Sequence, residues 1–299
     1  MKILLTGSNG FFGQIIIKAL QRENIFFTLS TNSGDYPIFL DKNIPSFREE
    51  YDLIIHAAGK AHSEPKTEAE KKHFFDVNNK GTLNLLQGLK KSGIPKKFVF
   101  ISSVAVYGQD FGSIISEEHI LKAKDPYGVS KIKAEENIIE WCKENNVICT
   151  ILRLPLLIGE NPLGNLRAMI KAIEKGYYFN IAGGGARKSM VLAKDVADFI
   201  PKVSEIGGIY NLTDGTHPSF YELSKVISKQ KGKKMPFNLP MSLARTIGKI
   251  GDLLGNKFPI NTSRLKKITS DLTFDDSKAR KKIGWNPMNV LKYLENNNL

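Results

Sequence analysis

The sequence predicts an α/β protein built on a doubly wound parallel sheet. Short apolar strands alternate with helical segments through about residue 160, as a parallel sheet with crossover helices requires. The first strand, expected over 2–6, leads into a glycine-rich turn and then into an apolar helical run over 14–20. Because a strand, a glycine turn and a helix in this order are typical of a dinucleotide-binding unit, we expect a Rossmann-like fold.

Three glycines form the turn after the first strand. Gly7, Gly10 and Gly13 permit a tight turn, close approach of the backbone to a pyrophosphate, and close packing of the helix on the strand. The helix that follows offers free N–H groups and its positive dipole end to phosphates. The turn therefore predicts a site for NAD or NADP.

The second strand, expected over 26–30, ends without the acid that commonly binds the adenosine ribose. Ser30 and Thr31 stand there instead, and the first acid is Asp35. A carboxylate would repel the 2′-phosphate of NADP, whereas small hydroxyl groups tolerate it. The stretch favours NADP mildly and leaves NAD open, since it contains no arginine.

A tyrosine and a lysine stand four residues apart in the run 125–131. On a helix Tyr127 and Lys131 would lie on the same face. An ammonium beside a phenol favours the phenolate, so we expect Lys131 to lower the pKa of Tyr127. Such a pair suits proton transfer to or from a sugar hydroxyl while a hydride leaves the same carbon.

Five segments in this order and spacing carry a resemblance to a known family: 6–13, 52–59, 77–82, 102–108 and 125–131. The chain resembles an extended short-chain dehydrogenase/reductase of the NAD-dependent epimerase/dehydratase family. Arg153-Leu154-Pro155, Asp195-Val196-Ala197 and 284–287 continue the resemblance. The most similar members are the 4-epimerases and 4-ketoreductases of the UDP-N-acetylglucosamine type, which serve surface-polysaccharide synthesis.

The resemblance implies roles for individual residues. Tyr127 is the expected acid/base at the sugar O4, Lys131 the contact to the nicotinamide ribose, and Ser103 the hydrogen-bond donor to the developing alkoxide or ketone. The cofactor is expected to contact Gly7, Asn9, Gly10, Phe11, Phe12, Gly13, Ser30, Thr31, Ala57, Ala58, Gly59, Asn78, Ile101, Tyr127, Lys131 and Leu154. The UDP-sugar is expected to contact Ser103, Val104, Asn165 and Arg187, the last two at its diphosphate.

Departures from the family pattern narrow the chemistry. Related 4,6-dehydratases place Asp-Glu after the position of Ser103, where this chain has Val104 and Ala105, which transfer no protons. We therefore expect redox chemistry at C4, as a 4-epimerase or a 4-keto-sugar reductase. The alternative is a non-catalytic NAD(P)-sensing regulator on the same fold, but such proteins typically lose the tyrosine or the lysine.

Charge, residue types and hydropathy limit the kinds of partner that the chain is expected to bind. The net charge is +13, yet the lysines are spread along the chain and no nucleic-acid motif is present, so no nucleic-acid partner is expected. Five histidines and two cysteines show no ligand spacing, so no metal is expected. No apolar run is long enough to span a membrane, and the first strand begins at Lys2. We expect a cytoplasmic protein with at most peripheral membrane contact.

The expected organisation is an NAD(P)-binding domain over 1–160 and a smaller mixed α/β substrate domain over 161–299. A helix near 194–204 and a strand near 208–212 are expected to rejoin the first domain. Helices expected over 68–92 and 127–145 form the surface through which relatives dimerise, so a homodimer is expected. The basic amphipathic segment 241–254 places Leu243, Ile247, Ile250 and Leu254 on one face, which favours packing within the second domain over docking on a membrane.

Overall fold

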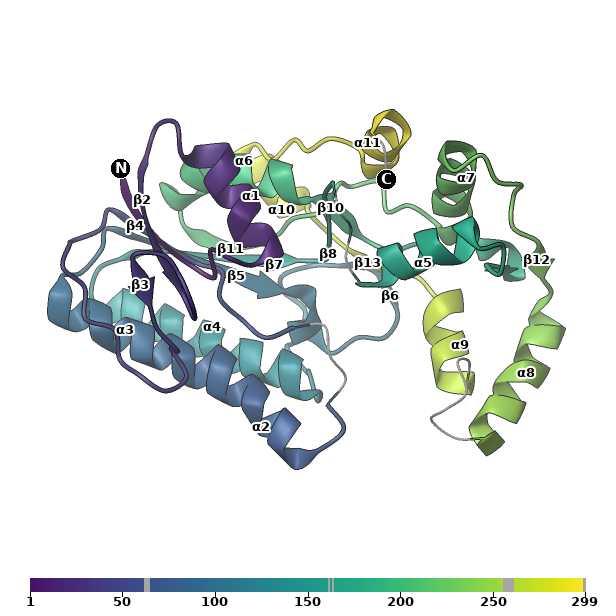
Figure 1. Ribbon diagram of the computed structural model, residues 1–299, viewed down its shortest axis with the longest axis horizontal. Coiled ribbons are helices and arrows are strands. Elements are labelled where there is room, and N and C mark those ends of the chain that lie inside the picture. The colour runs from purple at the N-terminus through teal and green to yellow at the C-terminus, as the bar shows by residue number, and fades with distance from the viewer. Residues whose placement is uncertain (62–64, 161, 163, 255–260, 298–299) are drawn as a thin grey trace.

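The computed structural model describes residues 1–61, 65–160, 162, 164–254 and 261–297. Its centre is a seven-stranded sheet of order β11-β7-β5-β4-β1-β2-β3, in which every neighbouring pair is parallel (Figure 1). The strands are β1 (Lys2–Thr6), β2 (Ile25–Ser30), β3 (Tyr36–Pro37), β4 (Leu53–His56), β5 (Lys97–Ser103), β7 (Ile148–Leu154) and β11 (Gly208–Asn211). The predicted Rossmann-like α/β fold is confirmed.

The middle strands are apolar because helices cover both faces of the sheet. β4 is buried along its whole length, and β1 is buried from its second residue on. Near-continuous burial of this kind is characteristic of parallel strands. The chain builds outward from β1 to β2 and β3, then crosses to β4 on the other side of β1. The carboxyl ends of β1 and β4 therefore flank a switch point, where ligands bind in open α/β sheets.

Each face of the sheet has its own helical layer and core. One core joins α1 to α6 and to the C-terminal helix α10, and includes Ile3, Ile16 and Ile200. The other joins α3 and α4 to the opposite face and includes Leu4, Leu85 and Ile138. The helices are α1 (Phe11–Leu20), α2 (Glu68–Phe75), α3 (Gly81–Ser92), α4 (Pro126–Glu144), α6 (Ala193–Ser204) and α10 (Ser277–Ile283). The two layers hold the carboxyl ends of the strands in fixed positions.

The helix expected over 68–92 is interrupted. α2 begins at a capping box in which Thr67 accepts a hydrogen bond from the Glu70 N–H at 3.2 Å. It ends at Phe75, and a π-helical segment, Asp76–Lys80, separates it from α3. The wider π turn carries Asn78 and changes the direction in which its side chain points. Such segments occur frequently at functional sites.

A second lobe follows the carboxyl end of the sheet. It contains α5 (Gly164–Glu174), β9 (Asn180–Ile181), α7 (Phe220–Gln230), β12 (Asn238–Leu239), α8 (Met241–Leu254), α9 (Thr262–Thr269) and α11 (Val290–Asn296). Two short parallel pairs connect it to the sheet: β8 (Leu156–Ile158) with β10 (Met190–Leu192), and β6 (Gly112–Ile115) with β13 (Leu272–Phe274). Its core is separate and includes Leu166, Ile170, Leu223 and Leu294. α6 and β11 lie with the sheet although they follow this lobe's first helix.

A buried histidine ties three elements together below the switch point. His56, at the end of β4, is 1% exposed. Its Nδ1 lies 2.6 Å from the Thr6 hydroxyl on β1, and its Nε2 lies 2.8 Å from the Thr82 hydroxyl on α3. Burial lowers the pKa of His56 to about 3, with a smaller contribution from the positive charge of Lys131. The ring therefore stays neutral at physiological pH and serves as a hydrogen-bonding spacer.

This neutrality predicts a pH dependence of stability. In the unfolded chain His56 takes up a proton below about pH 6.5, whereas the folded chain resists protonation down to a pKa of about 3. The free energy of unfolding should therefore fall as the pH drops through this window, by at most about 1.4 kcal/mol per pH unit from this residue. Urea denaturation of the wild type and His56→Asn across the window measures the effect. A slope unchanged by the substitution would show that His56 does not supply it.

Candidate active site

Tyr127 lies in the first turn of α4, at a helix start that the local sequence fixes. Asp125 is the N-cap, and its Oδ1 accepts a hydrogen bond from the Gly128 N–H at 2.9 Å, while Pro126 occupies the first helical position. Gly128 allows this turn to approach the 3₁₀ turn Val104–Tyr107, since a Cβ there would lie 2.8 Å from the Ala105 carbonyl oxygen. The start of α4 is thereby held against the end of β5.

Of two adjacent serines at the end of β5, Ser103 is the one beside Tyr127. Ser102 is buried, and its hydroxyl donates a short hydrogen bond to Glu135 on the core side. Ser103 is half-buried, caps the 3₁₀ turn through the Ala105 N–H at 3.2 Å, and lies near enough to the Tyr127 phenol to lower its pKa. The alternation of side chains along the strand thus selects the second serine.

Lys131 is buried four residues after Tyr127. Its ammonium donates a hydrogen bond to the Ile101 carbonyl oxygen at 2.8 Å and lies 4.4 Å from the centre of the Phe100 ring. Burial lowers the pKa of Lys131 to about 8, and the nearby Glu135 carboxylate opposes this change. The ammonium is thus held at a fixed point behind the carboxyl ends of β4 and β5.

The pKa of Tyr127 differs from the expectation. Burial raises it above its ordinary value; the nearby Ser103 side chain offsets part of this increase, and the Asp125 charge adds to it. Lys131, already bonded to Ile101 and Phe100, is not among the groups that lower it. Tyr127 is therefore protonated at neutral pH, which suits donation of a proton to a developing alkoxide.

Asn78 lies behind the site and joins the loop after β4 to α4. Its Oδ1 accepts a hydrogen bond from the Lys60 N–H at 2.7 Å, and its Nδ2 donates to the Lys60 carbonyl at 3.1 Å and to Ser130 at 2.9 Å. Gly59 is exposed between Asn78 and Lys131; a Cβ on it would lie 3.2 Å from the amide oxygen and 3.3 Å from the ammonium. The missing side chain leaves room for a ligand beside Lys131.

The glycine turn has the geometry that a dinucleotide requires. Gly7 has a positive φ of 72°, and a Cβ on it would lie 2.7 Å from the Ala58 backbone nitrogen. A Cβ on Gly13 would lie 2.2 Å from the Gly7 carbonyl oxygen, so α1 packs against the turn as no other residue permits. Gly10 is the N-cap of α1 and no side chain caps that end, which leaves its first N–H groups available to a phosphate. These residues fit NAD or NADP.

Hydroxyl groups and an amide order the loop after β2. Asn9 donates hydrogen bonds to the Ser30 hydroxyl at 2.9 Å and to the Ser33 hydroxyl at 2.8 Å. The first acid, Asp35, accepts hydrogen bonds from the backbone and side chain of Thr28 at 2.7 and 2.9 Å. Its carboxylate is therefore engaged within the turn. Ser30 is buried and Thr31 exposed, so the place of the usual ribose-binding acid is polar and uncharged.

The other expected cofactor residues lie along the same edge of the sheet. Ala57 and Ala58 follow β4, and the Ala58 N–H donates to the Thr6 hydroxyl at 3.1 Å. Phe12 and Leu154 are buried, whereas Phe11 is half-buried and its ring lies against Gly159. Most expected cofactor residues thus surround the switch point at the ends of β1, β4, β5 and β7.

The expected substrate residues divide between the lobes. Val104 directly follows Ser103 and is half-buried. Asn165 and Arg187 are exposed in the second lobe, and within the described parts of the chain no hydrogen bond or ion pair joins them to Ser103, Tyr127 or Lys131. Arg187 instead donates to the His217 carbonyl at 3.1 Å and pairs with Glu222 at 3.4 Å.

A buried ion pair supports the site. Its two residues have no role among those expected from the sequence. Arg153 on β7 and Glu135 on α4 are 4% and 2% exposed, and their closest N–O contact is 2.7 Å. The guanidinium also donates to Tyr107 at 3.1 Å, whose hydroxyl donates to Asn211 on β11 at 2.7 Å. Two signals were available: Glu135 stands four residues after Lys131, and Arg153 interrupts an apolar strand, where a charge needs a partner.

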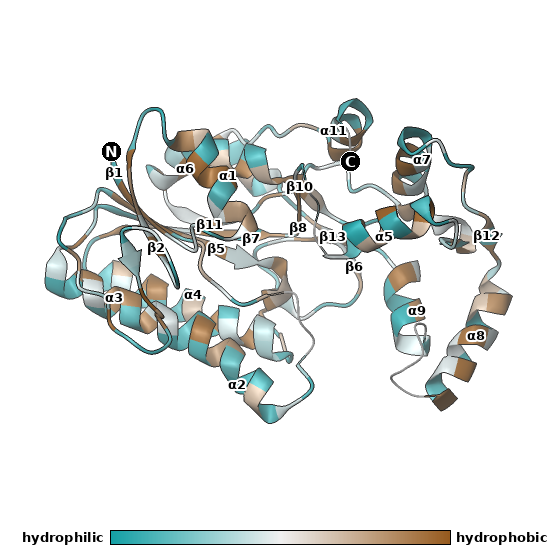
Figure 2. Cartoon of the chain, viewed as in Figure 1, coloured by the Kyte–Doolittle hydropathy of each residue, from teal (hydrophilic) through white to brown (hydrophobic). Residues whose placement is uncertain are grey.

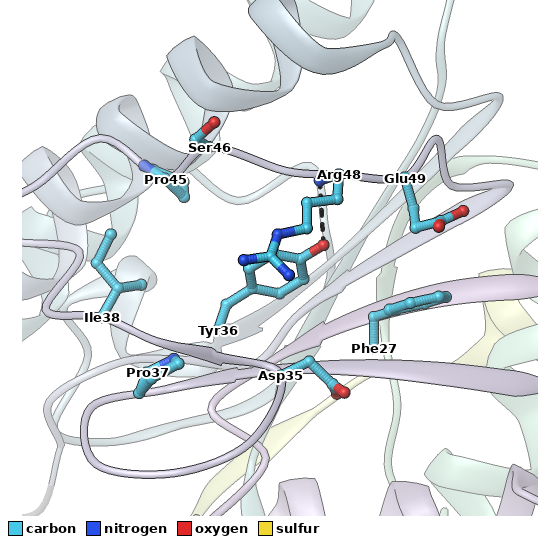
Figure 3. A pocket seen from close by; sticks show the side chains of 9 residues that line it. All are labelled: Phe27, Asp35, Tyr36, Pro37, Ile38, Pro45, Ser46, Arg48 and Glu49. Carbon is cyan, nitrogen blue, oxygen red and sulfur yellow. Dashed lines mark hydrogen bonds between the residues drawn. The ribbon is translucent and has the colours of Figure 1, made fainter.

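A pocket lies elsewhere, beside β3 and the loop before β4 (Figure 3). Phe27, Asp35, Tyr36, Arg48 and Glu49 line it, together with neighbours from β3 and the loop before β4. Its side chains carry both signs of charge, and the Tyr36 hydroxyl accepts a hydrogen bond from the Arg48 N–H at 3.2 Å. None of the residues around Tyr127 lines this pocket.

Comparison with known proteins agrees with this geometry. Residues 3–212, which include the glycine turn, Ser103, Tyr127 and Lys131, match the NAD dependent epimerase/dehydratase family. The chain belongs to this family. Its members are NAD(P)-dependent enzymes, so the predicted family, enzyme class and cofactor are confirmed. Among the described residues no group of three His, Cys, Asp or Glu side chains is placed to hold a metal ion.

Relatives of similar length are known. An N-acetyl-α-D-glucosaminyl-diphospho-ditrans,octacis-undecaprenol 4-epimerase of Escherichia coli O157:H7 is 27% identical over 93% of this chain and 88% of that protein. A UDP-glucose 4-epimerase of Vibrio cholerae is 26% identical over 97% of this chain and 92% of that protein. A UDP-glucuronic acid 4-epimerase of Bacillus cereus, solved with UDP-glucuronic acid and NAD, shares the fold with a TM-score of 0.75 and 19% identity, over 99% of this chain and 97% of that one.

The buried ion pair predicts a large effect on stability. Glu135→Gln leaves Arg153 as an unpaired buried charge and should lower the free energy of unfolding by about 3–5 kcal/mol. Adding Arg153→Met removes that charge and should recover part of the loss. Urea denaturation of both variants measures the difference. Equal stability of the single and double variants would show that the unpaired guanidinium carries no penalty.

Proposed function

We propose that the chain is a nucleotide-sugar oxidoreductase acting at C4 of a UDP-hexose or UDP-N-acetylhexosamine. The observation that carries the proposal is the grouping of Ser103, Tyr127 and Lys131 at one edge of the sheet, beside the space left by Gly59. It comprises a protonated phenol, a hydroxyl donor and a fixed ammonium next to a dinucleotide turn. The two curated relatives are named as 4-epimerases, which supports C4 as the reacting carbon.

Each residue has a defined task in this chemistry. Bound NAD(P)(H) supplies the hydride acceptor or donor. Tyr127 as the phenolate takes the O4 proton during oxidation, and as the phenol it returns that proton during reduction. Its raised pKa favours the phenol, which is the form that the reduction step needs. Ser103 donates a hydrogen bond to the same oxygen as negative charge develops there. Lys131 provides a fixed positive charge and a donor for a ribose hydroxyl.

Among the described residues, the turn after Ser103 lacks the groups that water elimination would need. Val104 and Ala105 form the turn after Ser103, and neither can transfer a proton. The chemistry is therefore confined to oxidation and reduction at a single carbon. Of the two outcomes, 4-epimerisation agrees with the named relatives, whereas reduction of a 4-keto sugar agrees with the uncharged loop at Ser30 and Thr31. We favour the 4-epimerase and keep the reductase as the alternative.

Nicotinamide nucleotide released from freshly purified, denatured protein separates these outcomes. An epimerase regenerates its cofactor at each turnover, so near-stoichiometric NAD(H) is expected. The same preparation should then interconvert a UDP-hexose or UDP-N-acetylhexosamine and its C4 epimer without added cofactor. An empty protein that binds NADPH and consumes it with a 4-keto UDP-sugar would contradict the epimerase and support the reductase.

Replacement of the phenol tests whether the chain is an enzyme. Tyr127→Phe removes the proton donor and leaves the ring, so kcat should fall about a thousandfold while cofactor binding is retained. Tyr177→Phe, at a tyrosine that is 58% exposed in the second lobe, is the matched control and should keep full activity. The contrary outcome is a wild type that binds cofactor but turns over no substrate, so that Tyr127→Phe has no activity to abolish. The chain is then an NAD(P)-sensing regulator instead.

Further parts of the proposal concern the setting of the enzyme. A role in surface-polysaccharide precursor synthesis is proposed from the same relatives, one of which acts on a lipid-linked sugar diphosphate. α2, α3 and α4 pack together along one face of the sheet and carry the exposed Leu83 and Ile139, which supports a homodimer through this face. In the described part of the chain no helix is long and apolar enough to cross a membrane.

A further inference from the structure

The apolar face of α8 does not pack in the way the sequence favours. The helix rests mainly on α9 through its small residues: Ala244, Gly248 and Gly251 are buried, and a Cβ on Gly248 would lie 3.6 Å from the Leu265 side chain. The stripe of Leu243, Ile247, Ile250 and Leu254 lies beside this contact. The expectation that it packs within the second lobe is therefore wrong for the described residues.

The stripe is largely accessible. Leu243, Ile250 and Leu254 are 50%, 46% and 60% exposed, and Leu253 on the adjoining flank is 88% exposed. Phe237, just before β12 and α8, is 81% exposed. Figure 2 shows apolar bands along α8, which extends away from the central sheet. Large apolar side chains are usually buried in a folded protein. A group of them exposed on one surface therefore indicates an interaction site.

Positive charge is concentrated in the part of the chain that carries the stripe. Residues 233–270 contain eight lysine or arginine residues and one aspartate, a net charge of +7, which is more than half of the +13 of the whole chain. The one acid, Asp252, is engaged by the Thr262 N–H at 3.1 Å. Within the described residues no carboxylate pairs with Lys233, Lys234 or Lys249. These ammonium groups are available to an anionic partner.

We propose that α8 is a membrane-docking helix that binds an anionic lipid surface. An exposed apolar stripe on a helix whose polar face and neighbouring segments are basic is the pattern of an interfacial helix, whose apolar side enters the acyl boundary while the cations contact anionic headgroups. A second copy of the chain fits poorly, since an isologous contact would bring two surfaces of charge +7 together. A nucleic acid would leave the apolar stripe without a partner. The proposal goes beyond the enzymatic function and does not depend on it.

Flotation of the full-length protein with lipid vesicles tests the proposal. The wild type should float with vesicles of equal parts phosphatidylcholine and phosphatidylglycerol, and much less with phosphatidylcholine alone. Binding should weaken as salt is added, because lysine contacts with headgroups are screened. The triple variant Leu243→Ser/Ile250→Ser/Leu254→Ser should lose about tenfold or more in vesicle affinity, since apolar burial supplies much of the binding.

The matched control uses exposed isoleucines of the first lobe. Ile25 and Ile206 are 61% and 50% exposed, similar to Leu254 and Ile250, and lie at the opposite end of the sheet. Ile25→Ser/Ile206→Ser should keep wild-type flotation. Thermal unfolding by circular dichroism checks that all variants fold; a charge variant, Lys234→Glu/Lys249→Glu, repeats the test without changing the stripe and should also lose affinity for the anionic vesicles.

Three results would overturn the proposal that α8 docks on membranes. These are a wild type that fails to float, equal flotation of the wild type and the stripe variant, and an isoleucine control that loses as much flotation as the stripe variant. Sedimentation velocity without lipid adds a fourth, because a wild-type dimer that the stripe variant converts to a monomer identifies a self-interface. Turnover of a water-soluble UDP-sugar should be the same in the stripe variant and the wild type. A failed vesicle test with intact turnover therefore leaves the enzymatic proposal unaffected.

Discussion

The buried ion pair between Glu135 and Arg153 is the constraint on which the site depends. It joins the middle of α4 to the end of β7, and Glu135 also accepts a hydrogen bond from Ser102 at the end of β5. An ion pair removed from water pays a large desolvation cost and persists only with nearly complete hydrogen bonding, which here fixes how α4 rotates against the sheet. That rotation places Tyr127 opposite Ser103. By occupying Ser102, the same pair determines which serine faces the site.

Burial sets the charge states around the switch point. The same loss of solvent lowers the pKa of His56 and of Lys131 and raises that of Tyr127, because in each case the charged form is disfavoured. Ser103 offsets part of the change in the pKa of Tyr127, and Glu135 offsets part of the change in the pKa of Lys131. The Glu135 carboxylate opposes the effect of burial on Lys131, so its pKa falls only to about 8 and it stays mostly charged at neutral pH. The result is a neutral phenol beside a charged amine, a polarised pair suited to proton transfer.

Much of this arrangement follows from local sequence. Gly7, Gly10 and Gly13 mark a turn whose close backbone contacts exclude a Cβ, and the Tyr127–Lys131 spacing needs only a helix, which Asp125 and Pro126 begin. The π-helical turn at Asn78 has no comparable signature, since it depends on bonds to Lys60 and Ser130, far away in the chain. Likewise the pairing of Arg153 with Glu135 cannot be predicted without knowing which strand lies beneath α4. The helical periodicity of the sequence correctly predicts the apolar stripe of α8. The helix nevertheless packs on α9 through small residues on another face.

The two lobes differ in how firmly they define function. In the first lobe every proposed catalytic side chain is held by buried neighbours, so its chemistry is fixed before substrate arrives. In the second lobe Arg187 is exposed and its pair with Glu222, at 3.4 Å, is of the kind that contributes at most about 1 kcal/mol. If Arg187 contacts the diphosphate of the proposed UDP-sugar, exchange of Glu222 for phosphate costs little, because a diphosphate carries more charge and accepts a bidentate guanidinium. The proposed reaction thus rests on the rigid sheet edge, and the proposed substrate contact rests on surface groups that can change partners.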